Sequence, residues 1–535
     1  MDKRKLIITG ENLTLQESRE VAEGRSSVEV APLSRKKVEE SRLKMEERMG
    51  GETPIYGFNM GFGQHQNVRV SPENLAKLQV NLIRTHAISF GDSAPIPVVR
   101  AAMLFRANAL AKGLSGVRWE VVETLVQWIN NPNLCPWVPK IGSLGASGDL
   151  SPLSHIAMNL LGEGRCWHRE DGSWVLVDAA GALEKEGVKP LVLEAKDGLA
   201  LNNGMQFTTA YLAYLIDRVE TAVTLSLALG AALSEVMLAT DLPFIPDVQR
   251  ARPYPGQEKA ARLLVACFQG SGIRESHRSP ELDPNTQDPY SSRCLPQVYG
   301  PCLDAITYAR RQMEVEINSA TDNPLVFGDK VVSGGNFHGM PVALTAAHLF
   351  NAFCGVVKMG EARVRRVVDK EKNRLGVSCL ISPEADRQVS SGMMILEYSY
   401  HALCNLILSW NSPAFLFSAS SASGQEDHVS HAPTVVLNLE RALDHFSYLL
   451  ALETFMTLQG YAVLEKLETP WRESGRIPQE GKLTPGRMGK LLQRLSKSCF
   501  RPLDQDRHMQ DEVERLREEL FLSDRLALEL KDWDL

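Results

Sequence analysis

The most restrictive feature of this 535-residue chain is a series of long segments without proline in its second part. Apolar residues recur there every three to four positions, which places them along one face of a helix. The segments are 205–240, 303–320, 343–369, 389–410 and 435–467. They exceed the roughly 11–12 residues of an average globular helix and lack sustained heptads. We therefore expect a bundle of long packed helices rather than a fibrous coiled coil.

The first 200 residues have a different character, with short segments separated by many glycines and prolines. One helix is expected over 34–49, with Ser34 as its N-cap. Short strands are expected over 174–177 and 191–193. The change in pattern predicts an N-terminal domain of residues 1–204 that mixes helices with short strands.

The remaining residues, 205–535, are predicted to form a second domain, the long-helix bundle. Two polar segments rich in turn residues interrupt its helices, at about 270–300 and 411–433. Long loops within a compact domain are more often functional than idle. We expect these two loops to carry site residues.

The charge and the cysteines limit the class of protein. A net charge of -7 gives no reason to expect nucleic acid or an anionic membrane as a partner. The nine cysteines are scattered, without a C-x-x-C pair, which is typical of reduced thiols in the cytoplasm. No signal segment opens the chain, and the apolar stretch 225–239 is interrupted by Ser226, Ser234 and Glu235. It predicts a buried core helix rather than a membrane span.

The most unusual string is G-S-L-G-A-S-G-D-L-S-P-L at residues 142–153. Its glycines can follow backbone paths that are closed to residues with bulky side chains. A plain interpretation is a tight turn before a helix capped by Asp149 or Ser151. A nucleophile elbow around Ser147 would need G-x-S-x-G, but Asp149 stands at the position of the last glycine.

This string also resembles the signature of the histidine, phenylalanine and tyrosine ammonia-lyases and their related aminomutases. In that family the amide nitrogen of the glycine attacks the alanine carbonyl and two waters are lost. The resemblance implies that Ala146, Ser147 and Gly148 form a methylidene-imidazolone (MIO), with no metal or diffusible cofactor. Such a group supplies an electrophile, which unmodified side chains lack. The serine hydroxyl is lost to leave the exocyclic methylene.

Further motifs of the same family recur in order along most of the chain. A tyrosine loop contains Met60 where threonine is usual. The matching strings are Y-G-F-N-M-G-F-G at 56–63, N-N-G at 202–204, Q-D-P-Y-S-S-R-C at 287–294, T-D-N-P-L at 321–325 and G-N-F-H-G at 335–339.

The resemblance implies a role for each of the residues that these motifs carry. Tyr56 becomes the general base, which requires surroundings that lower the pKa of its phenol. Tyr290 is the second phenol, and Asn203 would bind the MIO carbonyl oxygen. Phe337 would orient the MIO ring. Arg293 offers a planar fork for the substrate carboxylate.

Gln287 would hold that carboxylate or order the neighbouring loop. Two other positions bear on the substrate side chain. His86 stands where the histidine lyases carry histidine, and Glu426 lies in Q-E-D-H-V-S, where phenylalanine and tyrosine lyases have an uncharged amide. An imidazole can donate to one partner and accept from another, and a carboxylate can accept its N–H. Together these two residues point to L-histidine as substrate.

The neighbourhood of Glu426 also invites a metal-binding interpretation, because Asp427, His428 and His431 follow closely. The cluster lacks H-E-x-x-H or any other strict ligand spacing. We expect no metal there.

Several positions depart from the family pattern and bear on which amino acid is used. Apolar or aromatic residues replace more polar or smaller ones at Phe90, 406–408 and 415–417, and His431 stands where methionine is common. The runner-up within the family is a lyase or 2,3-aminomutase for tyrosine or another aromatic amino acid. Outside it, a hydrolase dependent on Ser147 and a helical scaffold are the competing hypotheses.

The resemblance implies an all-α fold with a long central bundle of the aspartase/fumarase type and a smaller mixed N-terminal domain. It also implies a homotetramer whose active sites draw loops from three subunits. The leading hypothesis is an enzyme that converts L-histidine to urocanate and ammonia.

Overall fold

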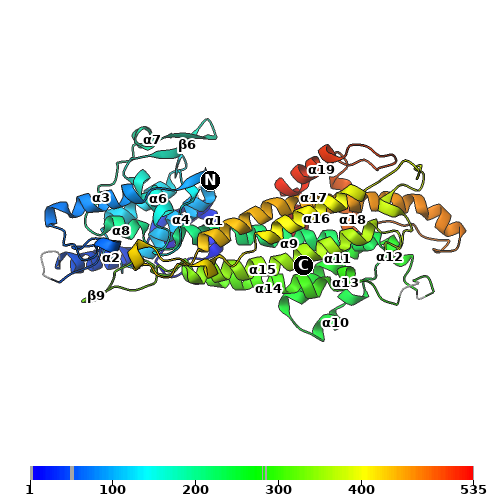
Figure 1. The fold of residues 1–535 in the computed structure, drawn as a ribbon, viewed down its shortest axis with the longest axis horizontal. Coiled ribbons are helices and arrows are strands. Elements are labelled where there is room, and N and C mark those ends of the chain that lie inside the picture. Colours follow the sequence, from blue (N-terminus) through cyan, green and yellow to red (C-terminus); the bar gives the residue numbers. More distant parts are fainter. Residues whose placement is uncertain (1–3, 49–52, 280, 284–285, 534–535) are drawn as a thin grey trace. The chain divides into compact units, whose positions relative to one another are not determined.

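The computed structural model of the protein describes residues 4–48, 53–279, 281–283 and 286–533. The chain divides into two compact units, each made of three segments (Figure 1). The first unit contains Met1–Ile216, Tyr308–Ala347 and Ser412–Leu437. The second contains Asp217–Thr307, His348–Asn411 and Asn438–Leu535. This division differs from a single boundary near residue 204, because the first unit takes in two later segments.

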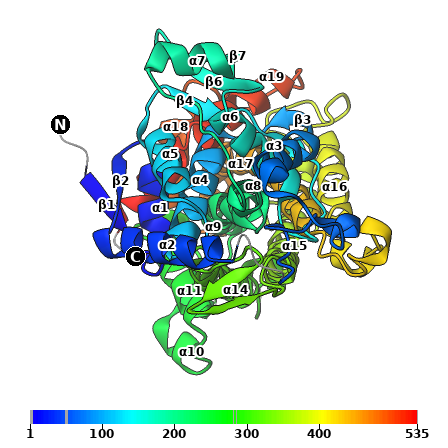
Figure 2. The same ribbon diagram turned by 90° about the vertical axis from the view of Figure 1, so that its left-hand side faces the viewer.

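The first unit combines short helices with small sheets. Its helices before residue 205 are α1 (Leu15–Ala22), α2 (Pro32–Glu46), α3 (Leu75–His86), α4 (Ile96–Ala111), α5 (Trp119–Asn130), α6 (Leu150–Leu160), α7 (Ala179–Glu186) and α8 (Asp197–Asn202). Helix α4 is almost entirely buried and packs against α1, α2 and α5 (Figure 2).

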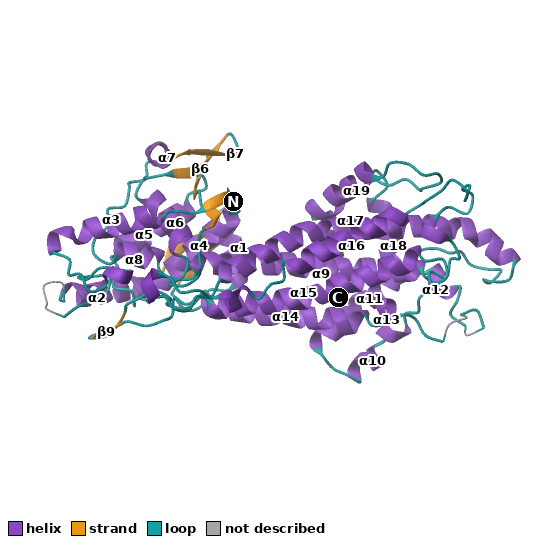
Figure 3. Cartoon of the chain, in the orientation of Figure 1, coloured by secondary structure: helices purple, strands orange, loops and turns teal. Residues whose placement is uncertain are grey.

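All strands in the described residues belong to the first unit (Figure 3). They are β1 (Arg4–Ile8), β2 (Ser26–Val30), β3 (Phe90–Ser93), β4 (Leu134–Pro136), β5 (Pro139–Ile141), β6 (Arg165–Glu170), β7 (Ser173–Asp178), β8 (Leu325–Phe327) and β9 (Lys330–Val332). β1 pairs with β2 in parallel, β3 with β5 and β8 with β9 antiparallel, and β4, β6 and β7 form one antiparallel sheet.

Five long helices follow the predicted segments. They are α9 (Gln206–Val236), α14 (Leu295–Glu316), α15 (Met340–Val368), α16 (Met394–Ser409) and α17 (Ala432–Glu473). Shorter helices of the second unit are α10 (Pro246–Arg250), α11 (Pro255–Phe268), α12 (Gly272–Glu275), α13 (Tyr290–Arg293), α18 (Arg487–Leu495), α19 (Gln510–Leu516) and α20 (Arg525–Lys531). The predicted mainly helical fold is confirmed.

The long helices extend past the predicted ends where proline had suggested a stop. Helix α14 runs through Pro301 and α17 through Pro470. A proline inside a helix removes one hydrogen bond and favours a kink. Buried residues on both sides of Pro301, such as Tyr299 and Cys302, supply packing that offsets this loss.

Two local predictions were wrong. Ser34 does not cap α2, because the helix starts at Pro32, whose fixed φ suits the first helical turn. The Ser34 hydroxyl instead donates to the carbonyl of Thr9 at 3.2 Å. Residues 191–193 form no strand, although the Leu191 N–H donates to the Leu160 carbonyl. The other predicted strand, 174–177, lies within β7.

Two helices, α9 and α15, are long and apolar enough to cross a membrane by length and composition, with mean hydropathies of 1.4 and 1.6 in their most apolar windows. Within those windows 83% of α9 and 56% of α15 is buried inside the protein. Even Glu235 near the end of α9 is buried, and its carboxylate accepts from the Tyr461 hydroxyl at 2.6 Å and the Gly486 N–H at 2.8 Å. Helix α9 is therefore packed as a core helix.

A buried polar network joins one residue from each long helix within the second unit. Arg363 of α15 pairs with Glu453 of α17 at 2.8 Å, and both side chains are at most 1% exposed. The guanidinium also donates to Tyr299 of α14 at 3.2 Å, whose hydroxyl lies 2.8 Å from that of Ser226 of α9. Tyr400 of α16 donates to Glu453 at 3.4 Å. Because each group has a partner on another helix, the network specifies how the five helices pack.

We predict that Glu453→Gln lowers the thermal unfolding midpoint by at least about 5 °C, since removing one partner of a buried ion pair costs roughly 3–5 kcal/mol. The remaining Arg363 charge would lie in the core without a counter-ion. Differential scanning calorimetry at fixed protein concentration measures this. The matched control is Lys259→Met, which removes an exposed 2.9 Å ion pair to Glu220 and should leave the midpoint unchanged. Equal shifts in both variants would contradict the special role of the buried pair.

Candidate active site

The A-S-G tripeptide lies in the loop between β5 and α6, where its backbone meets the loop after α8. Gly148 has φ +81°, and a Cβ there would lie 2.4 Å from the carbonyl oxygen of Gly204. The two glycines form an isolated parallel bridge, and the Asp149 N–H donates to the Gly204 carbonyl at 2.7 Å. Glycine is required at residue 148 both by conformation and by this close approach.

Asp149 anchors the same loop to the first turn of α9. Its buried carboxylate accepts from the N–H of Thr208 at 2.7 Å and from the Thr208 hydroxyl at 2.6 Å. Burial raises the pKa of Asp149 to about 6, against the lowering effect of these bonds. The plain turn interpretation expected Asp149 or Ser151 to cap α6, but neither side chain does so. The Ser151 hydroxyl lies 2.7 Å from that of Ser89.

Asn203 binds the middle residue of the tripeptide. Its side-chain amide donates to the carbonyl oxygen of Ser147 at 2.6 Å. The backbone carbonyl of Asn203 accepts in turn from the buried Arg106 guanidinium at 2.6 Å. Asn203 occupies the C-cap position of α8, so the end of this short helix aims its amide at the tripeptide.

Glu426 contacts the same serine from another loop. The Ser147 hydroxyl donates to one carboxylate oxygen of Glu426 at 2.6 Å, and the Ser421 hydroxyl donates to the other at 2.6 Å. The Ser421 N–H also donates to the Glu426 carbonyl at 2.8 Å, which closes a tight turn. Both carboxylate oxygens therefore have a donor in the unmodified chain.

Tyr56 is partly buried near this carboxylate. Its hydroxyl oxygen accepts from the Gly63 N–H at 3.1 Å, and its ring meets Phe62 edge-on at 6.2 Å between centroids. Burial raises the pKa of Tyr56, the Gly63 N–H lowers it, and the Glu426 charge raises it further. The lowered pKa that a phenolate base needs is thus absent from the unmodified chain.

The tautomer of His86 follows from its hydrogen bond. His86 is the last residue of α3, and its Nδ1 lies 2.8 Å from the Leu82 carbonyl oxygen. A carbonyl only accepts, so Nδ1 carries the hydrogen and Nε2 of the neutral ring is an acceptor. Burial lowers the pKa of His86, against the opposing effects of Leu82 and Glu426, and favours this neutral form.

The loop that carries Phe337 lies against the tripeptide loop. The Gly339 N–H donates to the Gly145 carbonyl at 3.3 Å, and the Ser430 hydroxyl donates to the same oxygen at 2.8 Å. Phe337 itself is partly buried. The first unit therefore contains eight of the eleven predicted site residues. They are Tyr56, His86, Ala146, Ser147, Gly148, Asn203, Phe337 and Glu426.

The other three, Gln287, Tyr290 and Arg293, belong to the second unit. Tyr290 opens the short helix α13 and is 69% exposed. The Arg293 guanidinium carbon lies 5.1 Å from the centre of the Tyr290 ring, and Arg293 forms no ion pair with a carboxylate in the described parts of the chain. Gln287 is exposed as well. Tyr290 and Gln287 are thus exposed, whereas Arg293 is partly buried, with its Nε atom buried and without a hydrogen-bond partner in the described chain.

Sequence reasoning missed the side chains that hold the site from behind, namely Arg106, Thr208 and Ser421. Each is separated by many residues or by a turn from the group that it holds, and no motif marks it. Among the described residues, no group of three or more His, Cys, Asp or Glu side chains could hold a metal ion. His428 instead stacks on His338 at 5.1 Å between ring centroids.

Some of the apolar departures noted in the sequence lie at the surface of the described chain, whereas Ile407 is buried. Phe90 in β3 is 63% exposed, and Leu416 and Phe417 are exposed too. Met60, in contrast, is buried and bridges to Arg69.

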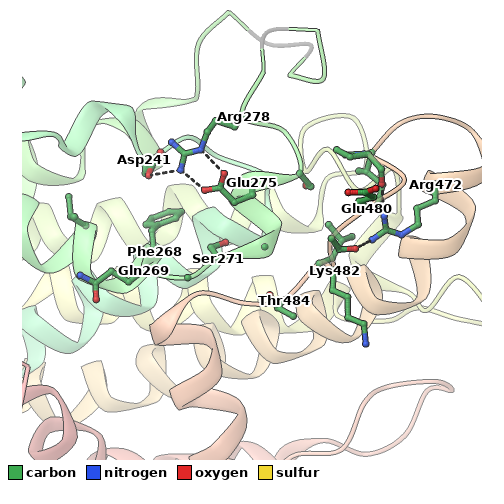
Figure 4. A pocket seen from close by; sticks show the side chains of 18 residues that line it. Asp241, Phe268, Gln269, Ser271, Glu275, Arg278, Arg472, Glu480, Lys482 and Thr484 are labelled. Carbon is green, nitrogen blue, oxygen red and sulfur yellow. Dashed lines mark hydrogen bonds and ion pairs between the residues drawn. The ribbon is translucent and has the colours of Figure 1, made fainter.

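A cavity of about 600 Å³ in the second unit contains none of the predicted site residues (Figure 4). Its rim is charged, but Arg278 pairs there with Glu275 at 2.6 Å and with Asp241 at 3.7 Å. Arg472 donates to backbone carbonyls of the same rim, including that of Gly481. Its arginines are already engaged, so we place the candidate active site at the tripeptide.

Known proteins resemble the chain over most of its length. The family model described as aromatic amino acid lyase matches residues 13–479. The histidine ammonia-lyase of Myxococcus xanthus is 36% identical over 516 residues, 96% of each chain, and that of Stigmatella aurantiaca is 39% identical over 86% of this chain and 88% of the relative.

Solved structures agree with this likeness. The histidine ammonia-lyase from Trypanosoma cruzi has a TM-score of 0.82 at 29% identity, over 98% of this chain and 95% of its own. Tyrosine aminomutase from Streptomyces globisporus has a TM-score of 0.85 at 30% identity, over 99% of both chains. The chain belongs to the aromatic amino acid lyase family.

Proposed function

We propose that the protein is an ammonia-lyase that converts L-histidine to urocanate and ammonia with an MIO formed from residues 146–148. The observation that carries the choice of substrate is the Glu426 carboxylate bonded to Ser147, with His86 close enough that the Glu426 charge raises its pKa against the lowering effect of burial. The similarity to two histidine ammonia-lyases, at 36% and 39% identity, supports histidine as the substrate. An aminomutase or lyase for tyrosine is the alternative, favoured by the aminomutase structure at 30% identity.

The residues around the tripeptide fit an MIO. Gly148 leaves its amide nitrogen free of side-chain crowding, and the Asn203 amide already donates to the Ser147 carbonyl oxygen, which the ring retains. When formed, the MIO supplies the electrophile that makes the substrate amine a better leaving group. Asn203 stabilises negative charge on the retained oxygen.

Loss of the Ser147 hydroxyl has a consequence for Glu426. One of its oxygens then loses the donor that holds it at 2.6 Å, while Ser421 keeps the other in place. A partly buried carboxylate oxygen without a donor favours a new N–H partner. An imidazole side chain supplies that N–H, whereas a phenyl ring supplies none.

The same partner changes the proton affinity of Tyr56. The Glu426 charge raises the pKa of Tyr56, and an N–H donor or a cationic ring at Glu426 offsets that effect. The Gly63 N–H continues to stabilise the phenolate. We therefore assign Tyr56 as the base that takes the β-proton, with activation that depends on an imidazole-bearing substrate.

Arg293, Gln287 and Tyr290 are proposed to bind the substrate carboxylate and to assist proton transfer. We propose that they reach the site in a homotetramer, with loops from three subunits in each active site. Exposed apolar side chains on α16, among them Ile395 and Tyr398, support such contacts between subunits. We further propose a cytoplasmic enzyme with an amino acid substrate and with no nucleic-acid, membrane or metal partner.

Intact-mass spectrometry tests the cofactor. Wild type should weigh two waters less than its encoded mass, and Ser147→Ala should not lose both, since alanine has no hydroxyl to eliminate. Histidine turnover should fall on the order of 10³-fold or more in the variant, as for a group that acts on the reacting atoms. A wild type at its encoded mass, or an active Ser147→Ala enzyme, would reject the MIO.

Tyr56→Phe separates proton transfer from cofactor formation. The ring and its packing on Phe62 remain while the hydroxyl is lost. We expect the mass loss of two waters to be unchanged and kcat to fall roughly 10²–10⁴-fold, the range of general acid–base catalysis. Mass spectrometry and urocanate absorbance measure the two effects. An unprocessed variant would move Tyr56 from catalysis to cofactor assembly.

Glu426→Gln tests whether Glu426 recognises the substrate side chain. A site built to accept an N–H loses most with the substrate that donates it. We expect kcat/KM for histidine to fall about 10–100-fold and any residual phenylalanine activity to change less. The assay compares histidine, tyrosine and phenylalanine, and identifies α,β-unsaturated and β-amino products. A wild-type preference for tyrosine, or equal losses for all substrates, would reject the histidine assignment.

A further inference from the structure

Asp288 is a buried carboxylate within the loop that carries Gln287, Tyr290 and Arg293. Only 5% of the residue is exposed. One of its oxygens accepts from the Thr240 N–H at 2.7 Å, just beyond the end of α9. The other lies 2.7 Å from the Arg374 guanidinium as a close ion pair that is not aligned as a hydrogen bond. A carboxylate this deeply buried needs such a partner.

Arg374 is itself held by a structured turn after α15. The side chain of Asn373, fully buried, donates to the carbonyls of Val367 at 2.9 Å and Val377 at 2.7 Å. It also accepts the N–H of Leu375 at 2.9 Å. Arg374 adopts φ +60° there and donates to the Leu238 carbonyl. The guanidinium thus lies between the Leu238 carbonyl and the Asp288 carboxylate, both in the second unit.

Asp288 is joined to the proposed substrate-binding residues by a stiff connection. Pro289, with φ −64°, leads directly into α13, and its carbonyl accepts the Arg293 N–H at 2.9 Å. The proline ring restricts its own backbone and that of the preceding residue. A shift of the Asp288 backbone is therefore transmitted to Tyr290 and Arg293.

We propose that Arg374 is a positioning residue, which grips Asp288 and so sets the orientation of the loop that binds the substrate carboxylate. This inference rests on the proposed function of that loop. Arg374 touches no reacting atom. It acts by keeping Arg293 preorganised, because a clamp displaced by about 1 Å loses on the order of 10²-fold in rate.

The test compares Arg374→Gln, Arg374→Lys and the control Arg472→Gln. Arg472 is a similarly buried arginine of the second unit, 19% exposed, which pairs with Glu468 instead. We expect Arg374→Gln to lower kcat/KM for histidine at least tenfold, partly through KM. Arg374→Lys should recover most of that loss, and Arg472→Gln should stay within twofold of wild type. All variants should retain the mass loss of two waters.

Hydrogen exchange provides a readout that does not depend on activity. The amides of residues 292–294 should exchange at least tenfold faster in Arg374→Gln than in wild type, and should stay protected in the control. If Arg374→Gln does not fold, Asp288→Asn tests the same contact and should give the same two effects. Unchanged kinetics and exchange in a folded variant, or losses shared by Arg472→Gln, would overturn the positioning role. A wild type without mass loss or lyase activity would instead reject the proposed function.

Discussion

The rest of the candidate site depends on the close approach of two glycines, Gly148 and Gly204. A Cβ on Gly148 would meet the Gly204 carbonyl at 2.4 Å, and a Cβ on Gly204 would meet the Arg106 guanidinium at 2.4 Å. Their contact brings Asn203 within 2.6 Å of the Ser147 carbonyl and Asp149 within 2.6 Å of Thr208. Backbone contacts thus hold the loop before α6 against the loop before α9. A side chain on either glycine would not fit between them.

Ser147 stands between two groups of opposite electrical character. The Asn203 amide donates to its carbonyl, and the Glu426 carboxylate accepts from its hydroxyl. The first contact draws electron density from the Ser147 carbonyl, whereas the second raises the electron density on the hydroxyl oxygen. The charge of Glu426 also raises the pKa of Tyr56, so one carboxylate affects both the serine and the phenol. Its neutralisation by a substrate ring would couple recognition to proton removal.

The sequence predicted the features that repeat or that belong to a contiguous motif. Helical periodicity located the five long helices, and the A-S-G string located the tripeptide loop. Prediction from the sequence failed where contacts between residues far apart in the chain decide the local structure. Packing carries α14 through Pro301, and a neighbouring strand's loop takes the Ser34 hydroxyl that was expected to cap α2. Arg106, which donates to the Asn203 carbonyl, lies in α4, 97 positions earlier in the sequence, so no local pattern could reveal it.

Arg293, the proposed ligand of the substrate carboxylate, could not be singled out by composition alone. Arg293 resembles any other arginine of the chain until its partners are considered. Most arginines of the second unit pair with a carboxylate, as Arg274 does with Asp241 at 2.8 Å. The Arg293 guanidinium instead stacks on Tyr290, and it pairs with no carboxylate in the part of the chain described. A cation held by an aromatic ring and by a braced loop pays little conformational entropy when an anion arrives. For the proposed binding of the substrate carboxylate by Arg293, that preorganisation would matter as well as the charge.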